Sequence, residues 1–148
     1  MTNDQQTKLA ELAKSFIGKP YKYGAKAEEA PDVFDCSLFT QYIFKQIGID
    51  LPRSTIEQAA EGDIVNGLEN LRVGDLIFLH GTRGHYNPRF PEGIGHVAVF
   101  IGDNKTVHAG SERIQEKPKI IEKGEVKEQT VEHVLSLYKP VIVIKRMA

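Results

Sequence analysis

Cysteine is nearly absent from this chain of 148 residues, which holds only Cys36 and so cannot form an internal disulfide. The covalent bridges typical of small secreted domains are therefore excluded. No apolar run approaches the roughly 20 residues that a membrane-spanning helix needs. The first residues also lack the basic region, followed by an apolar region, that marks a secretory signal peptide. As written, the sequence predicts no membrane span and no export signal.

An excess of positive charge is also missing, because 19 Lys and Arg residues stand against 20 Asp and Glu residues. General binders of nucleic acids or anionic membranes show a basic excess, so neither class is expected. The composition that is present, 41% hydrophobic and 26% charged, is that of an ordinary globular domain. At this length a compact fold buries about two-thirds of the surface that the unfolded chain exposes. We expect a single domain over 1–148 that is monomeric.

Hydrophobic periodicity predicts helices in the first half of the chain. Apolar residues recur at helical spacing over 9–17 and again over 36–47. An S-x-x-E capping box predicts a short helix at 54–57. One or two further helical turns are expected near the end, over 130–138.

Short runs of β-branched and aromatic residues predict strands in the second half. The runs lie at 76–79, 97–101, 106–109 and 141–144, and the charged stretch 116–127 is expected to form a solvated strand pair. Helices followed by strands indicate an α+β domain with the helices packed on one side of an antiparallel sheet.

The segment His80–Gly95 fits neither a helix nor a strand, because it contains four glycines and two prolines. It also carries Arg, His, Tyr and Phe side chains. Long irregular loops in compact domains are functional or mobile, and these side chains favour a functional loop. We expect it to border a substrate groove, with Tyr86 and Arg89 contacting the substrate. A mobile insertion is the alternative.

Three residues are candidates for nucleophilic catalysis. A lone cysteine is usually a buried small hydrophobe, but Cys36 follows Asp35 at the start of a predicted helix. Free backbone amides and the helix dipole favour a thiolate there. His96 and His108, on neighbouring predicted strands, could supply the base that a nucleophile needs. The pattern favours a Cys-His-His arrangement with a reactive thiolate at neutral pH.

Two other classes remain open on these residues. Cys36 with some of His80, His85, His96 and His108 could form a zinc site, but their spacing matches no recognised zinc pattern, so no metal or other cofactor is expected. A binding module that has kept the fold and lost the chemistry is the other class.

Six short stretches occur in an order that is typical of one family. They are Tyr21–Gly24, Phe34–Ser37, Leu51–Thr55 with Gln58, Leu71–Leu76, Gly95–Gly102 and Val107–Ala109. In this order the chain resembles the NlpC/P60 family of papain-like cysteine peptidases, which cut the stem peptides of peptidoglycan. The resemblance spans almost the whole chain and implies a papain-like fold.

The resemblance also implies a role for each matching residue. Cys36 corresponds to the nucleophile, His96 to the general base and acid, and His108 to the polar residue that orients it. Tyr21 stands where the family has a tyrosine that helps to stabilise the oxyanion.

The substrate side of the resemblance rests on Asp35 and Ser37, which flank the nucleophile in the groove. The implied reaction is hydrolysis of the stem peptide, at the bond from D-Glu to the diamino acid, in the cell envelope or outside the cell. An amidase-type effector or a phage lytic enzyme of the same fold is the alternative. Leu38 and Ala25 stand where the family has glycine, and we expect both to narrow or reshape the groove.

The spacing of the two histidines makes a prediction about the hairpin that joins their strands. A plain two-residue turn at Asp103-Asn104 would place His96 and His108 on opposite faces of the sheet, because side chains alternate. A register that pairs Ala98 with His108 places both histidines on one face. The sequence therefore predicts an odd-length or bulged connection.

Overall fold

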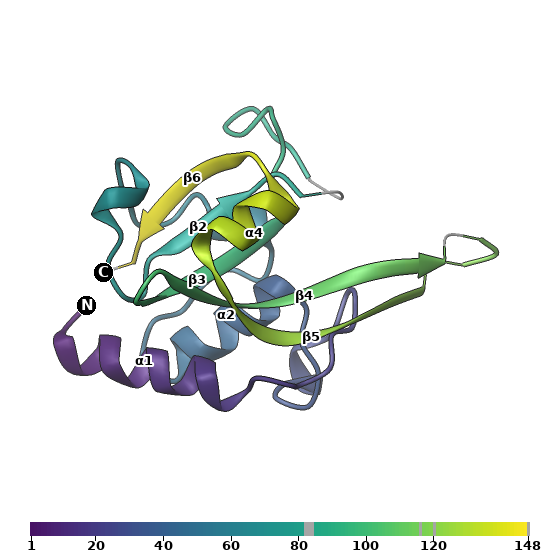
Figure 1. Cartoon of the computed structure of the whole chain (residues 1–148), viewed down its shortest axis with the longest axis horizontal. Helices are drawn as coiled ribbons and strands as arrows, with labels where there is room; N and C mark the ends of the chain where they lie inside the picture. The colour runs from purple at the N-terminus through teal and green to yellow at the C-terminus, as the bar shows by residue number, and fades with distance from the viewer. Residues whose placement is uncertain (82–84, 116, 120, 148) are drawn as a thin grey trace.

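The computed structural model describes residues 1–81, 85–115, 117–119 and 121–147. In these ranges the α-helices are α1 (Asn3–Ser15), α2 (Cys36–Lys45), α3 (Thr55–Gln58) and α4 (Val131–Tyr138). The strands are β1 (Asp63–Ile64), β2 (Leu76–Leu79), β3 (His96–Gly102), β4 (Lys105–Gln115), β5 (Ile121–Thr130) and β6 (Val141–Arg146). They form an antiparallel sheet in the order β1-β6-β2-β3-β4-β5 (Figure 1).

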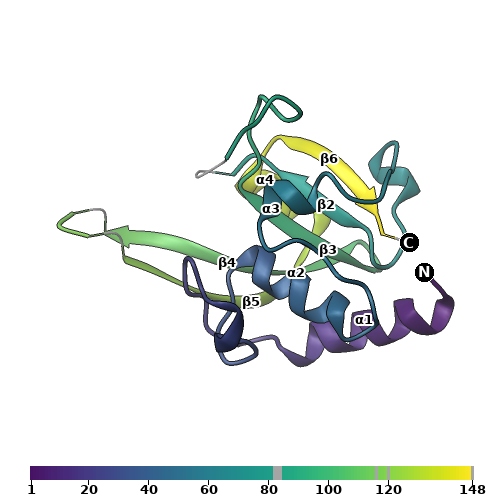
Figure 2. The same ribbon diagram turned by 180° about the vertical axis from the view of Figure 1, so that it is seen from behind.

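The sheet is covered by helices on both faces. Figure 1 shows α4 in front of the sheet, whereas Figure 2 shows α2 in front of it from behind. The side chains of β2 alternate accordingly, with Leu76 and Phe78 in the core that contains α2, and Ile77 and Leu79 in the core that contains α4. The N-terminal helices thus pack on one face as predicted. Helix α4 departs from that prediction, because its residue Val134 packs on the opposite face.

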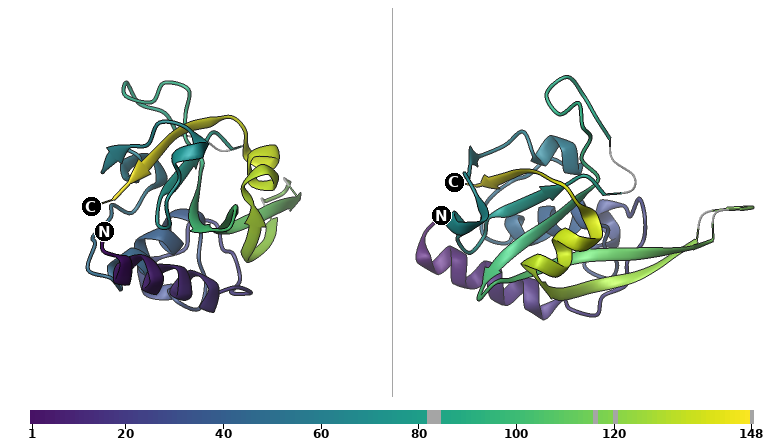
Figure 3. Two further views of the ribbon diagram at one scale, coloured as in Figure 1. Left: turned by 60° about the vertical axis from the view of Figure 1, so that its left-hand side comes forward. Right: turned by 45° about the horizontal axis from the view of Figure 1, so that its top comes forward.

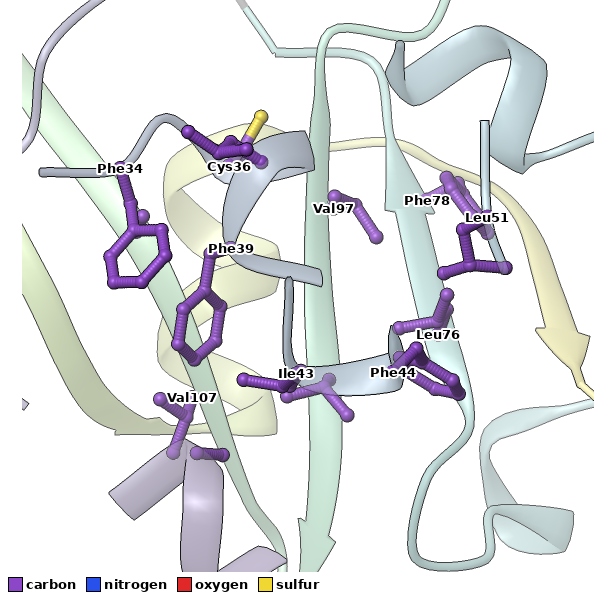
Figure 4. Packing of buried hydrophobic residues seen from close by; sticks show 14 of the residues in the cluster. Phe34, Cys36, Phe39, Ile43, Phe44, Leu51, Leu76, Phe78, Val97 and Val107 are labelled. Carbon is purple, nitrogen blue, oxygen red and sulfur yellow. The ribbon is translucent and has the colours of Figure 1, made fainter. Parts of the chain in front are cut away.

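Helix α2 is the centre of the larger core. It buries Phe39, Ile43 and Phe44 against the sheet, where they pack near Val97 and other strand residues (Figure 4). Burial of one such side chain contributes roughly 1.5–3 kcal/mol. The first turn of α2 is therefore held in a fixed position relative to β3.

Strands β4 and β5 form one long hairpin that extends well beyond the rest of the sheet (Figures 1 and 3). The sequence predicted a shorter strand at 106–109 and a separate strand pair in 116–127. The strand pair is wrong, because residues 121–127 belong to the single strand β5, which pairs with β4. Midway along the hairpin Gly124 lies against Gly110, where a Cβ atom would collide with the backbone of the facing strand. No helix in the described part of the chain is long and apolar enough to cross a membrane.

Candidate active site

Cys36 is the first residue of α2, and the residue before it fixes the start of the helix. The Asp35 carboxylate accepts a hydrogen bond from the Leu38 amide at 2.8 Å, as a helix N-cap does. The sulfur points away from the packed side chains of the core (Figure 4). It lies 3.5 Å from Thr55 Oγ1 and 3.9 Å from the Gly95 carbonyl oxygen, so it reaches the beginning of β3.

The ionisation of Cys36 differs from the sequence expectation. Burial, reinforced by the neighbouring Asp35 carboxylate, raises the pKa of the Cys36 thiol to about 11. Hydrogen bonds to Thr55 and to backbone amides act in the opposite direction, but they are weaker. Desolvation therefore outweighs the helix terminus. This shift favours a neutral thiol in the substrate-free protein, against the expectation of a thiolate at neutral pH.

The hairpin between β3 and β4 places the two histidines on one face, as predicted. Val99 pairs with Val107, and continuing this register by one residue places Ala98 opposite His108. The turn itself has two residues, Asp103 and Asn104, both with positive φ. The pairing shifts by one residue between Phe100 and Gly102, so the connection is bulged. This bulge cancels the change of face that the two-residue turn alone would cause.

The two histidine side chains are joined by a hydrogen bond of 2.9 Å between His96 Nε2 and His108 Nδ1. His108 Nε2 is bonded in turn to Gln129 Oε1, at 2.7 Å. Burial, with further unfavourable interactions with His108 and Lys127, holds the pKa of His96 well below its usual range. Burial also lowers the pKa of His108 to about 4, against the effect of its bond to Gln129. Both rings are therefore neutral at neutral pH.

Tyr138, the last residue of α4, covers the first histidine. Its ring stacks on His96, with centroids 3.8 Å apart and planes 11° from parallel. Gln129 is bonded to His108 and Tyr138 stacks on His96, so both histidines have a partner in the segment 129–138. Neither Gln129 nor Tyr138 was predicted to belong to the site. Tyr138 lies in the helical turns predicted over 130–138, which place a segment but assign no function to its side chains, and Gln129 lies just before them.

Asp35 and Ser37, predicted to contact substrate, are linked to each other and to Arg53. The Arg53 guanidinium donates hydrogen bonds to Asp35 Oδ2 at 2.7 Å and to Ser37 Oγ at 2.8 Å. It also bonds the Ala25 carbonyl oxygen. Arg53 belongs to the 51–55 stretch, but the sequence analysis gave it no role.

A pocket of about 300 Å³ brings the candidate residues together. Cys36, His96 and Tyr21 line it, together with Asp35 and Ser37. Tyr21 forms a parallel β-bridge with Phe34, two residues before Cys36, and so lies beside the start of α2. His108 does not line the pocket. It is bonded to His96 on the inner side and is fully buried.

The 80–95 segment reaches the pocket, but not through the two residues expected there. It contributes Gly81, His85, Ile94 and Gly95 to the lining, whereas Tyr86 and Arg89 lie outside the lining. Residues 82–84 fall outside the described part of the chain.

The two positions where glycine was expected also lie away from the pocket. Leu38 and Ala25 are buried in the core that contains α2 and do not line the pocket of Cys36. Among the described residues, no three His, Cys, Asp or Glu side chains are grouped so that they could hold a metal ion.

Comparison with known proteins shows the family and the fold of this chain. A family model described as the NlpC/P60 family matches residues 18–135. The chain belongs to the NlpC/P60 family. The solved NlpC/P60 domain of the peptidoglycan hydrolase SagA is 26% identical, covers 96% of this chain and 98% of that one, and superposes with a TM-score of 0.68. The papain-like fold inferred from the sequence is thereby confirmed.

Curated relatives carry names of peptidases, and one is named for murein. A gamma-D-glutamyl-L-lysine dipeptidyl-peptidase of Bacillus cereus is 36% identical over 101 residues, which is 68% of this chain and 27% of that protein. A murein DD-endopeptidase and LD-carboxypeptidase, MepS, of Escherichia coli K12 is 34% identical over 110 residues, or 73% and 51% of the two chains. The matched region spans between 16% and 51% of such relatives, so it corresponds to one part of each.

Proposed function

We propose that this NlpC/P60 domain is a cysteine peptidase that hydrolyses amide bonds in the stem peptides of peptidoglycan. The observation that carries the proposal is a pocket lined by both Cys36 and His96, with His96 bonded to His108 at 2.9 Å behind it. Cys36 is the nucleophile, His96 the general base and acid, and His108 the residue that orients His96.

The first step follows from the neutral state of both groups. As the sulfur attacks the amide carbon, the thiol proton passes to His96, so no separated charges need to exist before the substrate binds. Negative charge then develops on the carbonyl oxygen. The Cys36 amide, in the first helical turn where N–H groups have no intrahelical acceptor, and the Tyr21 hydroxyl stabilise that charge.

Breakdown of the intermediate requires the proton to move again. His96 donates it to the leaving amine, which leaves an acyl group on the sulfur as a thioester. Water, activated by the now neutral His96, hydrolyses the thioester and restores the thiol. His108 stabilises the transient imidazolium of His96 by accepting its Nε2 hydrogen bond throughout.

The finer specificity proposed is the bond from D-Glu to the diamino acid, with action in the cell wall as a monomer. The name of the Bacillus cereus relative supports this bond, and the name of the Escherichia coli relative describes other bonds. Asp35, Ser37 and Arg53 form the polar wall of the pocket beside the nucleophile and are proposed to bind the substrate.

Digestion of defined stem peptides, with mass analysis of the fragments, tests the proposal. We expect cleavage between D-Glu and the diamino acid, and no cleavage by Cys36→Ala, whose small side chain leaves the core intact. Far-ultraviolet circular dichroism checks that the variant is folded. Intact stem peptides after incubation with folded wild-type protein would contradict the peptidase function, and cleavage at another bond would contradict only the specificity.

A further inference from the structure

Gln129 is the polar side chain bonded to His108 on the side away from His96. It lies near the end of β5, where it pairs with Thr106 of β4. The buried Thr106 hydroxyl donates a hydrogen bond of 3.0 Å to the Gln129 main-chain carbonyl, which fixes the backbone at this point. The side-chain oxygen of Gln129 then lies 2.7 Å from His108 Nε2.

We propose that Gln129 is a positioning residue that sets the tautomers of both histidines and thereby decides which nitrogen of His96 accepts the Cys36 proton. The inference rests on the proposed function for the roles of Cys36 and His96. Gln129 itself touches neither of them and acts through His108.

The hydrogen bonds from Gln129 to His96 fix where each proton lies. A carbonyl oxygen only accepts, so His108 must carry its proton on Nε2 to bond Gln129 Oε1. A neutral imidazole has one N–H, which leaves His108 Nδ1 as an acceptor. His96 must then carry its proton on Nε2 to make the 2.9 Å bond, and its Nδ1 is left with a free lone pair.

The position of the sulfur agrees with Nδ1 as the base. Nδ1 is the ring nitrogen nearer to the main chain of its own residue. The Cys36 sulfur lies 3.9 Å from the carbonyl oxygen of Gly95, the residue directly before His96. The lone pair set by Gln129 is thus on the nitrogen that is not bonded to His108 and that lies nearer to the main chain beside the sulfur.

Each of these hydrogen bonds has one fixed donor and one fixed acceptor only while both imidazole rings stay neutral. Burial disfavours the charged form of each, and Lys127 of β5 and His133 of α4 further disfavour a charge on His108. If Gln129 donated from its amide group instead, every bond would reverse. His96 would then present an N–H to the thiol and could not accept its proton.

Three substitutions of Gln129 separate these possibilities by hydrolysis of the same stem peptides. Gln129→Glu can only accept and should retain activity within about threefold, and Gln129→Met, which makes no bond, should lose about tenfold. Gln129→Lys can only donate, which favours the wrong tautomers, and should lose at least about 100-fold. Lys123→Glu and Lys123→Met, at an exposed site on the same strand, are the matched controls and should retain full activity. Equal activity of the Glu and Lys variants of Gln129 would overturn the proposal.

Nitrogen-15 NMR of labelled histidine reads the tautomers without reference to hydrolysis. In the wild-type protein, His96 and His108 should both be protonated on Nε2. In folded Gln129→Lys both should carry the proton on Nδ1. A wild-type His108 protonated on Nδ1 would overturn the inference, whatever the activity. The expected tautomers in a protein that cleaves no stem peptide would support the role of Gln129 and contradict the proposed function alone.

Discussion

Cys36 and His96 line one pocket, but the chain positions them by different means. Cys36 is fixed locally, by the Asp35 cap and by the packing of the helix that it begins. His96 is fixed by partners that lie 12 to 42 residues away in the sequence, through strand register, a bond to His108 and a stack on Tyr138. The comparison teaches that local signals place the nucleophile, whereas long-range pairing places the base.

The largest expected effect comes from removing the base. His96→Ala should lower kcat/KM on stem peptides by about 100-fold to 10,000-fold, the range for loss of a general acid and base. His108→Ala should cost less, because His96 keeps its stack on Tyr138. Steady-state kinetics measures both. An equal or larger loss in His108→Ala would show that orientation of the base, and not its presence, limits the reaction.

The ionisation of the nucleophile can be followed by alkylation. With the pKa of Cys36 raised to about 11, the thiolate fraction increases tenfold per pH unit across the neutral range. The rate of reaction with iodoacetamide should therefore rise about 1,000-fold between pH 6.5 and pH 9.5. Mass spectrometry of the protein gives the rate. A rate that is already constant above pH 6.5 would indicate a resting thiolate and contradict the assignment.

The histidine pair should make stability depend on pH. Because the pKa of buried His108 is lowered to about 4, the unfolded chain binds a proton below about pH 6.5 and the folded protein does not until lower pH. Buried, neutral His108 therefore contributes fully to the free energy of unfolding above pH 6.5. As the pH falls towards 4, the free energy of unfolding decreases by about 3 kcal/mol. The pKa of His96 is shifted in the same direction.

Urea unfolding at a series of pH values measures this loss. His108→Asn is the matched variant, because it removes one of the two titrating groups and should reduce the loss of stability between pH 6.5 and pH 4. A wild-type stability that stays constant over this range would contradict the burial of neutral histidines.

The smallest expected effect concerns the 80–95 segment. Tyr86 and Arg89 lie outside the pocket lining, and Tyr86 is 77% exposed. The double variant Tyr86→Ala, Arg89→Ala should therefore change kcat/KM by less than about twofold. His85→Ala, in the same segment but lining the pocket, is the comparison and should have the larger effect. A loss of activity in the double variant but not in His85→Ala would support the substrate contact that the sequence predicted for Tyr86 and Arg89.

The sequence predicted the parts of this molecule that depend on local chemistry. Helix α2, its start at Cys36 and the match to the family motifs all follow from periodicity, capping and residue type. The bulged connection could be predicted too, because side-chain alternation and the spacing of the two histidines exclude a plain two-residue turn. These are consequences of short-range geometry.

The rest depends on contacts that no local pattern encodes. Gln129 and Tyr138 reach the histidines only because β5 pairs with β4 and α4 crosses the second face of the sheet. The neutral state of Cys36 could not be predicted either, because the helix terminus is visible in sequence and the depth of burial is not. Tyr86 and Arg89 were assigned from residue type alone, and the fold of the segment directs other residues to the pocket.

The bulge at the end of β3 has a consequence for hairpins of different length. Adding or removing one residue in the regular part of either strand moves the side chains that follow to the opposite face of the sheet. With this bulge and turn retained, the separation of His96 and His108 along the chain can change only in steps of two. A hairpin engineered so that the two histidine positions differ by 10 or 14 would keep both rings on one face of the sheet, and a difference of 11 or 13 would need a second bulge to do so.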